Sequence, residues 1–490
     1  MSDDRDALDL QRLGYRQELR RRLGGFSTFA IGFSVISVLT GITSTFGDAF
    51  GAGGPVGLGV GWPIVAAGTM LVALGMAELA SAFPTAGALY HWSALLGGPA
   101  WGWATAMLNL VGQIAIVAAI DLACGQALAQ SLGLGDVPGY VLFAFVLLLH
   151  GVLNATSVRL VGWLNDASAT VHIVGVAVLS VLLLRARAHD FGYLLTSAPT
   201  TRPDHSRCLG FVQALVLGVW TFTGFDAAAH VSEETHDPRR RAPLGIVSSV
   251  AVSAVAGFAL LAALVLAVRD PEATAGAEDA ALHVLSGALG ATAGRFALGL
   301  AVLAMWFAGL SSVTSASRML FAFARDGGVP LAAQLRRVSP ATGTPLYATG
   351  ACVAAPLALV AGTIPLSPKV FLAVASLATV ALCASYAAPI GLGAVARAQG
   401  RWTRPGPWSL GRAGVPVAWA AVAWTLFVFV VCTLANGAAM LAFAVILGLL
   451  TALWLVVVRK TFQGPKVHLA QFEPTDTAPR SSAGPPPPRG

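Results

Sequence analysis

The feature that most constrains this chain is a series of apolar runs, each about 20 residues long, which is the length that an α-helix needs to cross a bilayer. Only 11% of the residues are charged, whereas about 25% are charged in ordinary soluble domains. This pattern predicts an all-α membrane protein and excludes a soluble enzyme. We predict about twelve transmembrane helices, near residues 27–50, 57–82, 101–130, 138–155, 162–184, 211–231, 244–268, 293–323, 345–363, 370–392, 415–434 and 437–458.

The basic residues are distributed unevenly between the segments that connect these spans. With both termini in the cytoplasm, 23 of the 30 Lys and Arg residues fall on the cytoplasmic side, as expected for membrane proteins. The net charge of +7 is therefore an orientation signal. A nucleic-acid patch is the weaker interpretation, because no basic cluster falls on a folded soluble element. We predict a multi-pass protein of the plasma (inner) membrane with both termini cytoplasmic.

Two of the spans carry a break of the same kind. Residues 37–43 read Ser-Val-Leu-Thr-Gly-Ile-Thr and residues 221–226 read Thr-Phe-Thr-Gly-Phe-Asp, with the two Thr-Gly steps 183 residues apart. Glycine between hydroxyls and small residues can unwind a helix, and unwound backbone is tolerated in a bilayer only where protein buries it or a cavity solvates it. Two such segments in matching positions of two halves indicate a substrate site at the midplane of a secondary transporter.

The positions of the breaks predict two related halves of five spans each. Because five is odd, alternating spans give the halves opposite orientations, which is the inverted-repeat arrangement. The broken helices are the first and the sixth, and the last two helices are extra. We therefore divide the chain into a cytoplasmic tail (1–25), a first five-helix repeat (26–185), an external loop (186–210), a second five-helix repeat (211–392), helices eleven and twelve (393–460) and a disordered cytoplasmic tail (461–490).

Three motifs occur in an order that is typical of one group of permeases. Residues 77–92 read Ala-Glu-Leu-Ala-Ser-Ala-Phe-Pro-Thr-Ala-Gly-Ala-Leu-Tyr-His-Trp, residues 223–239 include Thr-Gly-Phe-Asp and Glu-Glu-Thr-His-Asp-Pro-Arg, and residues 317–327 read Ser-Arg-Met-Leu-Phe-Ala-Phe-Ala-Arg-Asp-Gly. They resemble the signatures of the amino acid–polyamine–organocation (APC) superfamily. Residues 37–43 and a histidine in span five resemble its amino acid/choline transporter branch, which carries amino acids, 4-aminobutyrate or choline.

The first break offers donors for an anion. Unwinding frees backbone N–H groups at the positive end of a helix dipole, where a substrate carboxylate is the natural partner. We place these N–H groups at Thr40, Gly41 and Ile42, with hydroxyls from Ser37 and Thr43. The resemblance implies the same carboxylate-binding role. The alternative is a kink that neighbouring helices fill.

The second break offers acceptors and rings for an amine. Its freed carbonyls, from Trp220 to Phe222, suit an ammonium group, and the loop continues through Thr223 and Gly224. Phe222 and Phe225 bring rings beside it, and the resemblance places an aromatic ring near Phe222 over the substrate. The alternative is that these rings only pack.

Polar residues inside the spans form a second group of candidates. A carboxyl at Asp226 is by default a functional hypothesis: it pairs with the substrate amine, takes a proton, or caps freed N–H groups, as Asp does at helix starts. Asn109 and Gln113 are four residues apart and share one helical face, which lines the pathway or binds a helix. Asp121, in the same span, has no assigned role.

His172 in the fifth span is the candidate for proton coupling. The resemblance matches its position to a lysine that takes the place of a sodium ion in proton-coupled members. Histidine titrates at about pH 6.5 when unperturbed, so we expect a coupling residue, or a fixed cation beside the first and eighth helices. The alternative is a histidine that only joins helices. We favour a proton over a sodium ion and expect no cofactor or metal, although hydroxyls suited to sodium occur at Ser311, Ser312, Thr314 and Ser315.

Two further sites are interpreted as gating or structural. Glu78 is interpreted as a structural anchor, with a gate as the alternative, and Trp306 as a contributor to gating or to an aromatic cage. The charged segment 233–241 contains Glu233, Glu234 and three consecutive arginines. We interpret it as a solvated loop, with a gate latch as the alternative.

These predictions together describe a permease that imports an amino acid or 4-aminobutyrate by alternating access, coupled to a proton. Choline or another quaternary amine is the alternative within transport, because such a cation needs an aromatic cage. An exchanger, a nutrient sensor that does not carry its ligand, and a channel are further alternatives. The expected partners are a small amino-acid-like molecule and membrane lipids, and no nucleic acid. The candidate cage residues are Trp220, Phe222, Phe225 and Trp306.

Overall fold

The computed structural model describes residues 2–134, 136–197, 207–277, 279–367, 369–435 and 437–465. Over these residues the chain is helical without a β-strand. Eleven helical segments are long and apolar enough to cross a membrane, with Gly25–Gly59 counted as one segment. The sixth predicted span is filled by two shorter pieces, α9 (Arg207–Thr221) and α10 (Ala227–His230). The prediction of an all-α membrane protein with about twelve spans is confirmed.

The helix bounds follow the predicted apolar runs closely, because the runs end where polar, Gly or Pro residues begin. Helices α6 and α11 each start with proline at the first position, where its missing N–H costs nothing. The long helices are α2 (Gly25–Ile36), α3 (Val38–Gly59), α4 (Gly61–Ala82), α6 (Pro99–Ser131), α7 (Asp136–Thr156), α8 (Val158–Arg185), α11 (Pro238–Leu266), α14 (Ala291–Arg325), α16 (Leu346–Thr363), α17 (Val370–Ala398), α18 (Gly414–Ala435) and α19 (Gly437–Val456).

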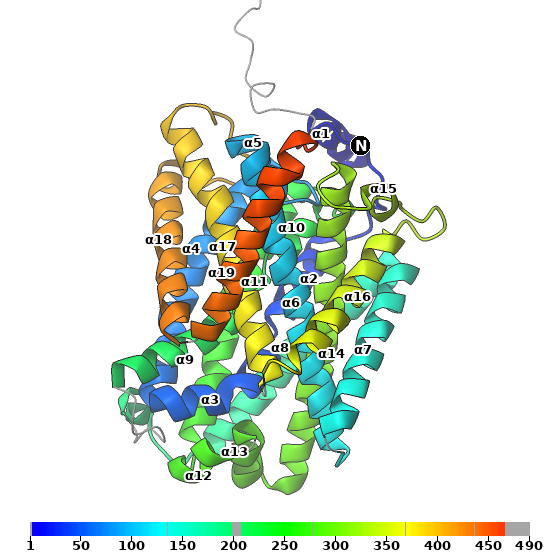
Figure 1. The fold of residues 1–490 in the computed structure, drawn as a ribbon. Helices are drawn as coiled ribbons and strands as arrows, with labels where there is room; N and C mark the ends of the chain where they lie inside the picture. Colours follow the sequence, from blue (N-terminus) through cyan, green and yellow to red (C-terminus); the bar gives the residue numbers. More distant parts are fainter. Residues whose placement is uncertain are drawn as a thin grey trace, which may run out of the picture.

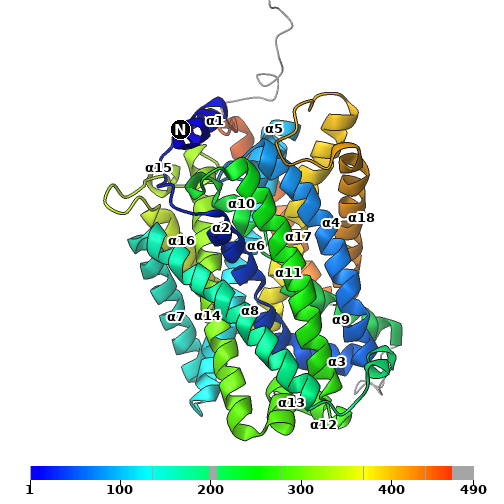
Figure 2. The same cartoon turned by 180° about the vertical axis from the view of Figure 1, so that it is seen from behind.

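Short helices mark the two ends of the bundle. One end, which we call the N-terminal face, carries α1 (Ser2–Arg12), α5 (Leu89–Gly97) and α15 (Ala332–Leu335) (Figure 1). The opposite end, the far face, carries α12 (Pro271–Gly276) and α13 (Ala280–Leu289), as both views show (Figures 1 and 2). In Figure 1, α3 lies across the direction of the long helices, in the half near the far face.

Inner and outer helices differ in burial. In α6, 78% of an 18-residue apolar stretch is buried inside the protein, against 6% of such a stretch in Met440–Lys460, which includes most of α19. The exposed apolar side chains of α19 and α18 fit a lipid environment, whereas α6 forms part of the core. Two predicted segments lie partly outside the described residues, namely 198–206 of the external loop and 466–490 of the C-terminal tail. The equivalence of the two five-helix halves stays a prediction.

Candidate functional site

The first break lies at Ser37, between α2 and α3. Its backbone has φ 36° and ψ 79°, a left-handed conformation that is uncommon for a residue other than glycine. The Ser37 Oγ accepts the N–H of Thr40 at 3.4 Å as a helix cap, and Gly41 N–H donates to the Ser37 carbonyl at 2.9 Å. The prediction that the Gly41 N–H is free is wrong, because α3 already begins at Val38. The N–H groups that lack a helical acceptor are those of Val38 and Leu39.

The other residues predicted at the first break lie inside α3. Ile42 is buried within the helix, and the Thr43 hydroxyl donates to the carbonyl of Leu39 at 2.6 Å. Such a bond back to the helix satisfies the hydroxyl without a ligand. Thr43 nevertheless lines the cavity described below.

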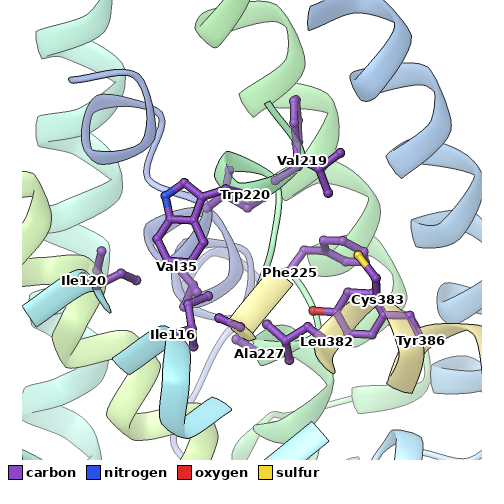
Figure 3. Close-up of a cluster of buried hydrophobic side chains, with 14 of the residues drawn as sticks. Val35, Ile116, Ile120, Val219, Trp220, Phe225, Ala227, Leu382, Cys383 and Tyr386 are labelled. Carbon is purple, nitrogen blue, oxygen red and sulfur yellow. The ribbon is translucent and has the colours of Figure 1, made fainter. Parts of the chain in front are cut away.

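Two glycines allow the two breaks to pack against each other. A Cβ at Gly41 would lie 2.3 Å from the Cγ2 of Thr221, at the end of α9. A Cβ at Gly224 would lie 2.2 Å from the Cγ1 of Val35, near the end of α2, and Gly224 has φ 89°, which favours glycine. The breaks are therefore in reciprocal contact, and Figure 3 labels Val35 and Trp220 in one cluster of buried side chains.

His172 faces the first break from α8. Its Nδ1 lies 2.9 Å from the carbonyl oxygen of Ser168, so Nδ1 carries a proton and donates it. Its Nε2 lies 2.8 Å from the Ser37 Oγ, which is also hydrogen-bonded to the hydroxyl of Thr40. In a neutral ring, Nε2 accepts from the Ser37 hydroxyl. Among the described residues no hydrogen bond joins this ring to α14, so only the predicted contact with the first span is observed.

Asp226 lies in the second break and is fully buried. Asn109 and Gln113 donate to its Oδ2 at 3.1 and 3.2 Å, the Tyr386 hydroxyl donates to its Oδ1 at 2.9 Å, and His230 Nε2 lies 3.3 Å from Oδ2. A carboxylate has about four acceptor positions, and these contacts place partners at both of its oxygens. Its side chain makes no cap bond to α10, and the capping interpretation is wrong. Asn109 and Gln113 share one face as predicted, and that face binds the second break.

The backbone of the second break is partly satisfied by its own turn. The Trp220 carbonyl accepts the N–H and the hydroxyl of Thr223 at 3.1 and 2.6 Å. The N–H of Gly224 donates to the Tyr386 hydroxyl at 3.2 Å. The Trp220 carbonyl, predicted to be freed for an amine, is therefore occupied, because the chain turns back on it.

The four rings proposed for an aromatic cage are not assembled around one point. Within the described part of the chain, no ring contact joins any two of them. Each packs instead with a different neighbour, because the rings leave their helices in different directions; Figure 3 shows one such pair, Phe225 and Tyr386. The pairs are Trp220 with Phe371, Phe222 with Trp62, Phe225 with Tyr386, and Trp306 with His150.

A cavity of about 560 Å³ lies in the half near the far face, bounded by α3, α6, α13, α14 and α17. Asp48 and Gln130 line it and are exposed, so it opens to the outside of the protein. Its inner wall includes Thr43, Ser44 and Phe371. Because the Phe371 ring also contacts Trp220, with centroids 6.0 Å apart, these two rings separate the cavity from the second break.

The N-terminal face is closed by buried ion pairs. Arg325 of α14 donates to Glu233 at 2.8 Å, and Arg318 Nε donates to Glu234 at 3.2 Å. Both glutamates are almost completely buried, so the interpretation of a solvated loop is wrong for them. The gate-latch interpretation stays a prediction, and the ion-pair partners of the two glutamates come from α14 and not from the neighbouring arginines in the sequence.

The chain start completes this closure. The backbone of Leu23 pairs with that of Thr235 in an isolated β-bridge. The hydroxyls of Tyr15 and Tyr90 donate to Asp326 at 2.7 and 2.9 Å. Several apolar side chains before α2 are also buried there, so the first two dozen residues form part of the closed face. These side chains are Leu10, Leu13, Leu19 and Leu23.

The acids of the N-terminal face differ in how readily they bind a proton. Burial acts to raise the pKa of Glu233, but the Arg325 guanidinium outweighs it and the pKa lies below its usual value. The pKa of Asp326 is also lowered despite burial, because His91 hydrogen-bonds to it. For Glu234, burial raises the pKa and its arginine partner offsets only part of the rise. As the pH falls, Glu234 is therefore the first of the three to be protonated.

Glu78 lies at the end of α4 on the N-terminal face. It pairs with Arg397 of α17 at 2.7 Å and accepts the N–H of Leu410 at 2.7 Å. These contacts tie α4 to α17 and to the segment before α18, and they support the anchor interpretation. Trp306, grouped with it, lies on α14 and its ring packs against that of His150 of α7.

The hydroxyls of α14 are mostly used between helices. Thr314 donates to Asn154 of α7 at 2.7 Å, Ser311 donates to Asn165 of α8, and Ser312 bonds back to its own helix at 2.8 Å. Ser315 Oγ is buried without a partner among the described residues. Helix packing therefore accounts for most of this set.

Three residues that contact the second break were not predicted from the sequence. His230 follows Asp226 by four residues, so the same spacing rule that paired Asn109 with Gln113 could have found it. Tyr386 and Phe371 come from α17, far along the chain, and no local pattern connects them to the second break.

The comparisons with known proteins agree with this architecture. The family model described as amino acid permease matches residues 23–458. The chain belongs to this family. The permease is 35% identical to an amino-acid permease BAT1 homolog of Oryza sativa subsp. japonica, over 94% of this chain and 95% of the relative. It is 34% identical to amino-acid permease BAT1 of Arabidopsis thaliana, over 94% and 96%.

A more distant relative has a more specific name. The permease is 28% identical to a GABA-specific permease of Saccharomyces cerevisiae, over 86% of this chain and 77% of the relative. The resemblance to the APC superfamily is confirmed. The protein is a multi-pass membrane transporter of amino acids and not an enzyme.

Proposed function

We propose that this permease imports an amino acid or 4-aminobutyrate across the plasma membrane by alternating access, together with a proton. The excess of Lys and Arg at the N-terminal face supports a cytoplasmic position for that face. In this orientation the ion pairs of Glu233 and Glu234 close the cytoplasmic side, and the cavity of about 560 Å³ opens outward. The structure then corresponds to a state that receives substrate from outside.

The single observation that carries the proposal is the polar junction at Ser37. The start of α3 presents the N–H groups of Val38 and Leu39 at the positive end of its dipole. With the hydroxyls of Ser37 and Thr40, they form a site suited to a substrate carboxylate. The substrate amine would point toward the second break, behind Trp220.

A proton at His172 would act directly on this junction. The neutral ring accepts from the Ser37 hydroxyl, whereas the protonated ring has an N–H at both nitrogens and must donate. Because Nδ1 already donates to Ser168, a second proton enters at Nε2 and reverses the hydrogen bond with Ser37. The Ser37 hydroxyl must then turn toward another acceptor, such as the hydroxyl of Thr40. Proton binding thus rearranges the groups that meet the carboxylate.

Uptake by the purified protein in proteoliposomes tests the proposal. Labelled neutral amino acids, 4-aminobutyrate and choline would be offered with and without an inward proton gradient. We expect an amino acid or 4-aminobutyrate to be accumulated, and the gradient to increase its uptake about tenfold. Accumulation of choline alone, or binding without uptake, would contradict the proposed substrate or the transport itself.

The coupling claim needs its own variant and control. In His172→Gln the hydrogen bond to Ser37 can persist, but the side chain no longer titrates, so we expect gradient stimulation to disappear while exchange without a gradient remains. His283, an exposed residue of α13, provides the matched control, and His283→Gln should behave like the unmodified protein. Full gradient stimulation in His172→Gln would overturn coupling through this residue.

A further inference from the structure

A second set of buried polar side chains lies away from both breaks, between α6, α7 and α14. Asp121 of α6 and His150 of α7 are fully buried, with Oδ2 and Nδ1 3.1 Å apart. Within the described part of the chain, the other atoms of the pair, Asp121 Oδ1 and His150 Nε2, have no hydrogen-bond partner. Titratable groups inside membrane spans are costly and usually functional. The mechanism proposed above uses neither residue.

The pair is covered by one point of α14. A Cβ at Gly309 would lie 1.8 Å from Asp121 Oδ1 and 2.7 Å from His150 Cε1. The backbone of α14 therefore lies directly over the carboxyl oxygen that lacks a partner. A new hydrogen atom on His150 Nε2, the ring nitrogen bonded to this Cε1, requires an acceptor, which the present position of α14 does not supply.

Contacts lead from the pair to the closed N-terminal face. Asn154, one turn after His150, donates to the His150 carbonyl at 3.1 Å and to a carbonyl of α14 at 3.2 Å. Its Oδ1 accepts from Thr314 at 2.7 Å and from Arg318 at 3.4 Å. Arg318 in turn holds Glu234. We call this set the α7–α14 seam; it comprises Asp121, His150, Asn154, Thr314, Arg318 and Glu234, all buried.

The other end of the pair lies next to the cavity. Ala123 and Met305 line the cavity; the first follows Asp121 by two residues and the second precedes Gly309 by four. The indole ring of Trp306 covers the imidazole of the pair, with centroids 5.1 Å apart. The pair thus lies within about one helical turn of the cavity lining on both α6 and α14.

Few other titratable groups approach the seam. On α6, Cys124 interacts with Asp121, and on α16, Cys352 interacts with Arg318. Among the described residues, no arginine or lysine forms an ion pair with Asp121 or His150. Further protons at this end of the seam are therefore bound by the pair itself.

We propose that Asp121 and His150 form a second proton-binding site, and that α14 transmits its protonation along the α7–α14 seam to the Arg318–Glu234 closure. The proposal rests on the transport function proposed above. A proton reaching the pair from the cavity binds at His150 Nε2 and turns a neutral imidazole beside a carboxylate into an imidazolium beside a carboxylate. The added N–H has no acceptor in the described part of the chain, so α14, which packs against this ring at Gly309, must shift to provide one. Arg318, on the same helix, moves with it.

The test uses two variants of similar shape that do not titrate, Asp121→Asn and His150→Gln, in proteoliposomes. Uptake of a substrate that the unmodified protein carries would be compared at about pH 5.5 and pH 7.5. We expect the ratio of the two rates to fall at least about threefold in each variant, while substrate affinity at fixed pH stays within about twofold. Unmodified pH ratios in both folded variants would overturn the proposal.

Two alanine variants on the same helix test the transmission step. Gly309→Ala places a methyl group against the pair and should lower uptake about tenfold at every pH. Gly299→Ala is the matched control, because nothing lies within 4 Å of its Cβ position. Normal uptake in Gly309→Ala would contradict the role of α14. If the unmodified protein carries none of the substrates, the proposed function is wrong. If it carries a substrate but the pH ratios of the variants stay unchanged, only the second proton site is wrong.

Discussion

The two breaks contain similar residues but are stabilised in opposite ways. The first is a single left-handed residue, Ser37, with one titratable partner, His172. The second is a turn of several residues around Asp226, which is held by side chains from α6, α10 and α17. One proton or one hydroxyl rotation can therefore change the first break. The second can change only when several helices move together, so we assign sensing to the first and mechanical linkage to the second.

The strongest test of this comparison is to replace the glycine of the second break. In Gly224→Ala the new Cβ would lie 2.2 Å from Val35, and φ is 89°. A positive φ alone costs a residue with a side chain about 1–2 kcal/mol, and the collision adds to it. We expect uptake to fall to background and the yield of folded protein to drop, as measured by size-exclusion chromatography. Gly350→Ala, where nothing lies within 4 Å, is the control, and normal uptake in Gly224→Ala would contradict the rigid second break.

The next largest effect is expected from Asp226→Ala. The substitution removes the acceptor of Tyr386, Asn109 and Gln113, and each hydrogen bond to a charged group contributes about 1.5–3 kcal/mol. We expect the thermal midpoint in detergent to fall clearly, with a smaller fall in Asp226→Asn, which keeps one acceptor oxygen. An unchanged midpoint with lost uptake would instead place Asp226 in contact with substrate.

The glycine of the first break should be more tolerant. In Gly41→Ala the atoms nearest to the methyl group all belong to the side chain of Thr221, and α3 is regular at this point. We expect uptake to fall about tenfold, because inserting one extra methyl group into a packed site costs about 1–3 kcal/mol. Thr221→Ala, added to Gly41→Ala, should restore part of the rate. A double variant no better than the single one would show that the two breaks do not move against each other.

The smallest effect is expected from Ser37→Ala. The variant loses a helix cap, worth about 1 kcal/mol, and the hydrogen bond to His172. We expect a nearly unchanged thermal midpoint, a KM raised about fivefold and a flatter dependence of uptake on pH. If the pH dependence is unchanged while that of His172→Gln is lost, the histidine acts without the serine.

The transmembrane architecture could be predicted from the sequence because each span is a local property. The apolar run that became α17 starts at the predicted residue 370, and both breaks fall inside the predicted spans. The first break is displaced from Thr40-Gly41 to Ser37. A serine that caps the N–H of the residue three positions later is a known helix start. This signal was present in the sequence, but the prediction gave more weight to the glycine.

The partners of the buried charges could not be predicted in the same way. Glu233 and Glu234 stand close to three arginines in the sequence, yet they bind Arg325 and Arg318 of α14. The burial of these glutamates depends on α14 and on the chain start folding over them. Pairing that depends on packing between distant segments leaves no local pattern in the sequence. The partner of His150 could not be predicted for the same reason.

The position of the chain start has a consequence for how the protein is made. Tyr15 donates to Asp326, 311 residues further along the chain. At a synthesis rate of about 5–20 residues per second, the first segment waits about 15–60 s for this partner to emerge. During that time Leu10, Leu13 and Leu19, which are buried in the finished protein, have no surface to pack on. The closed face is therefore assembled late, because it joins the earliest part of the chain to one of the later parts. A bulky fusion at the N-terminus would interfere at that step.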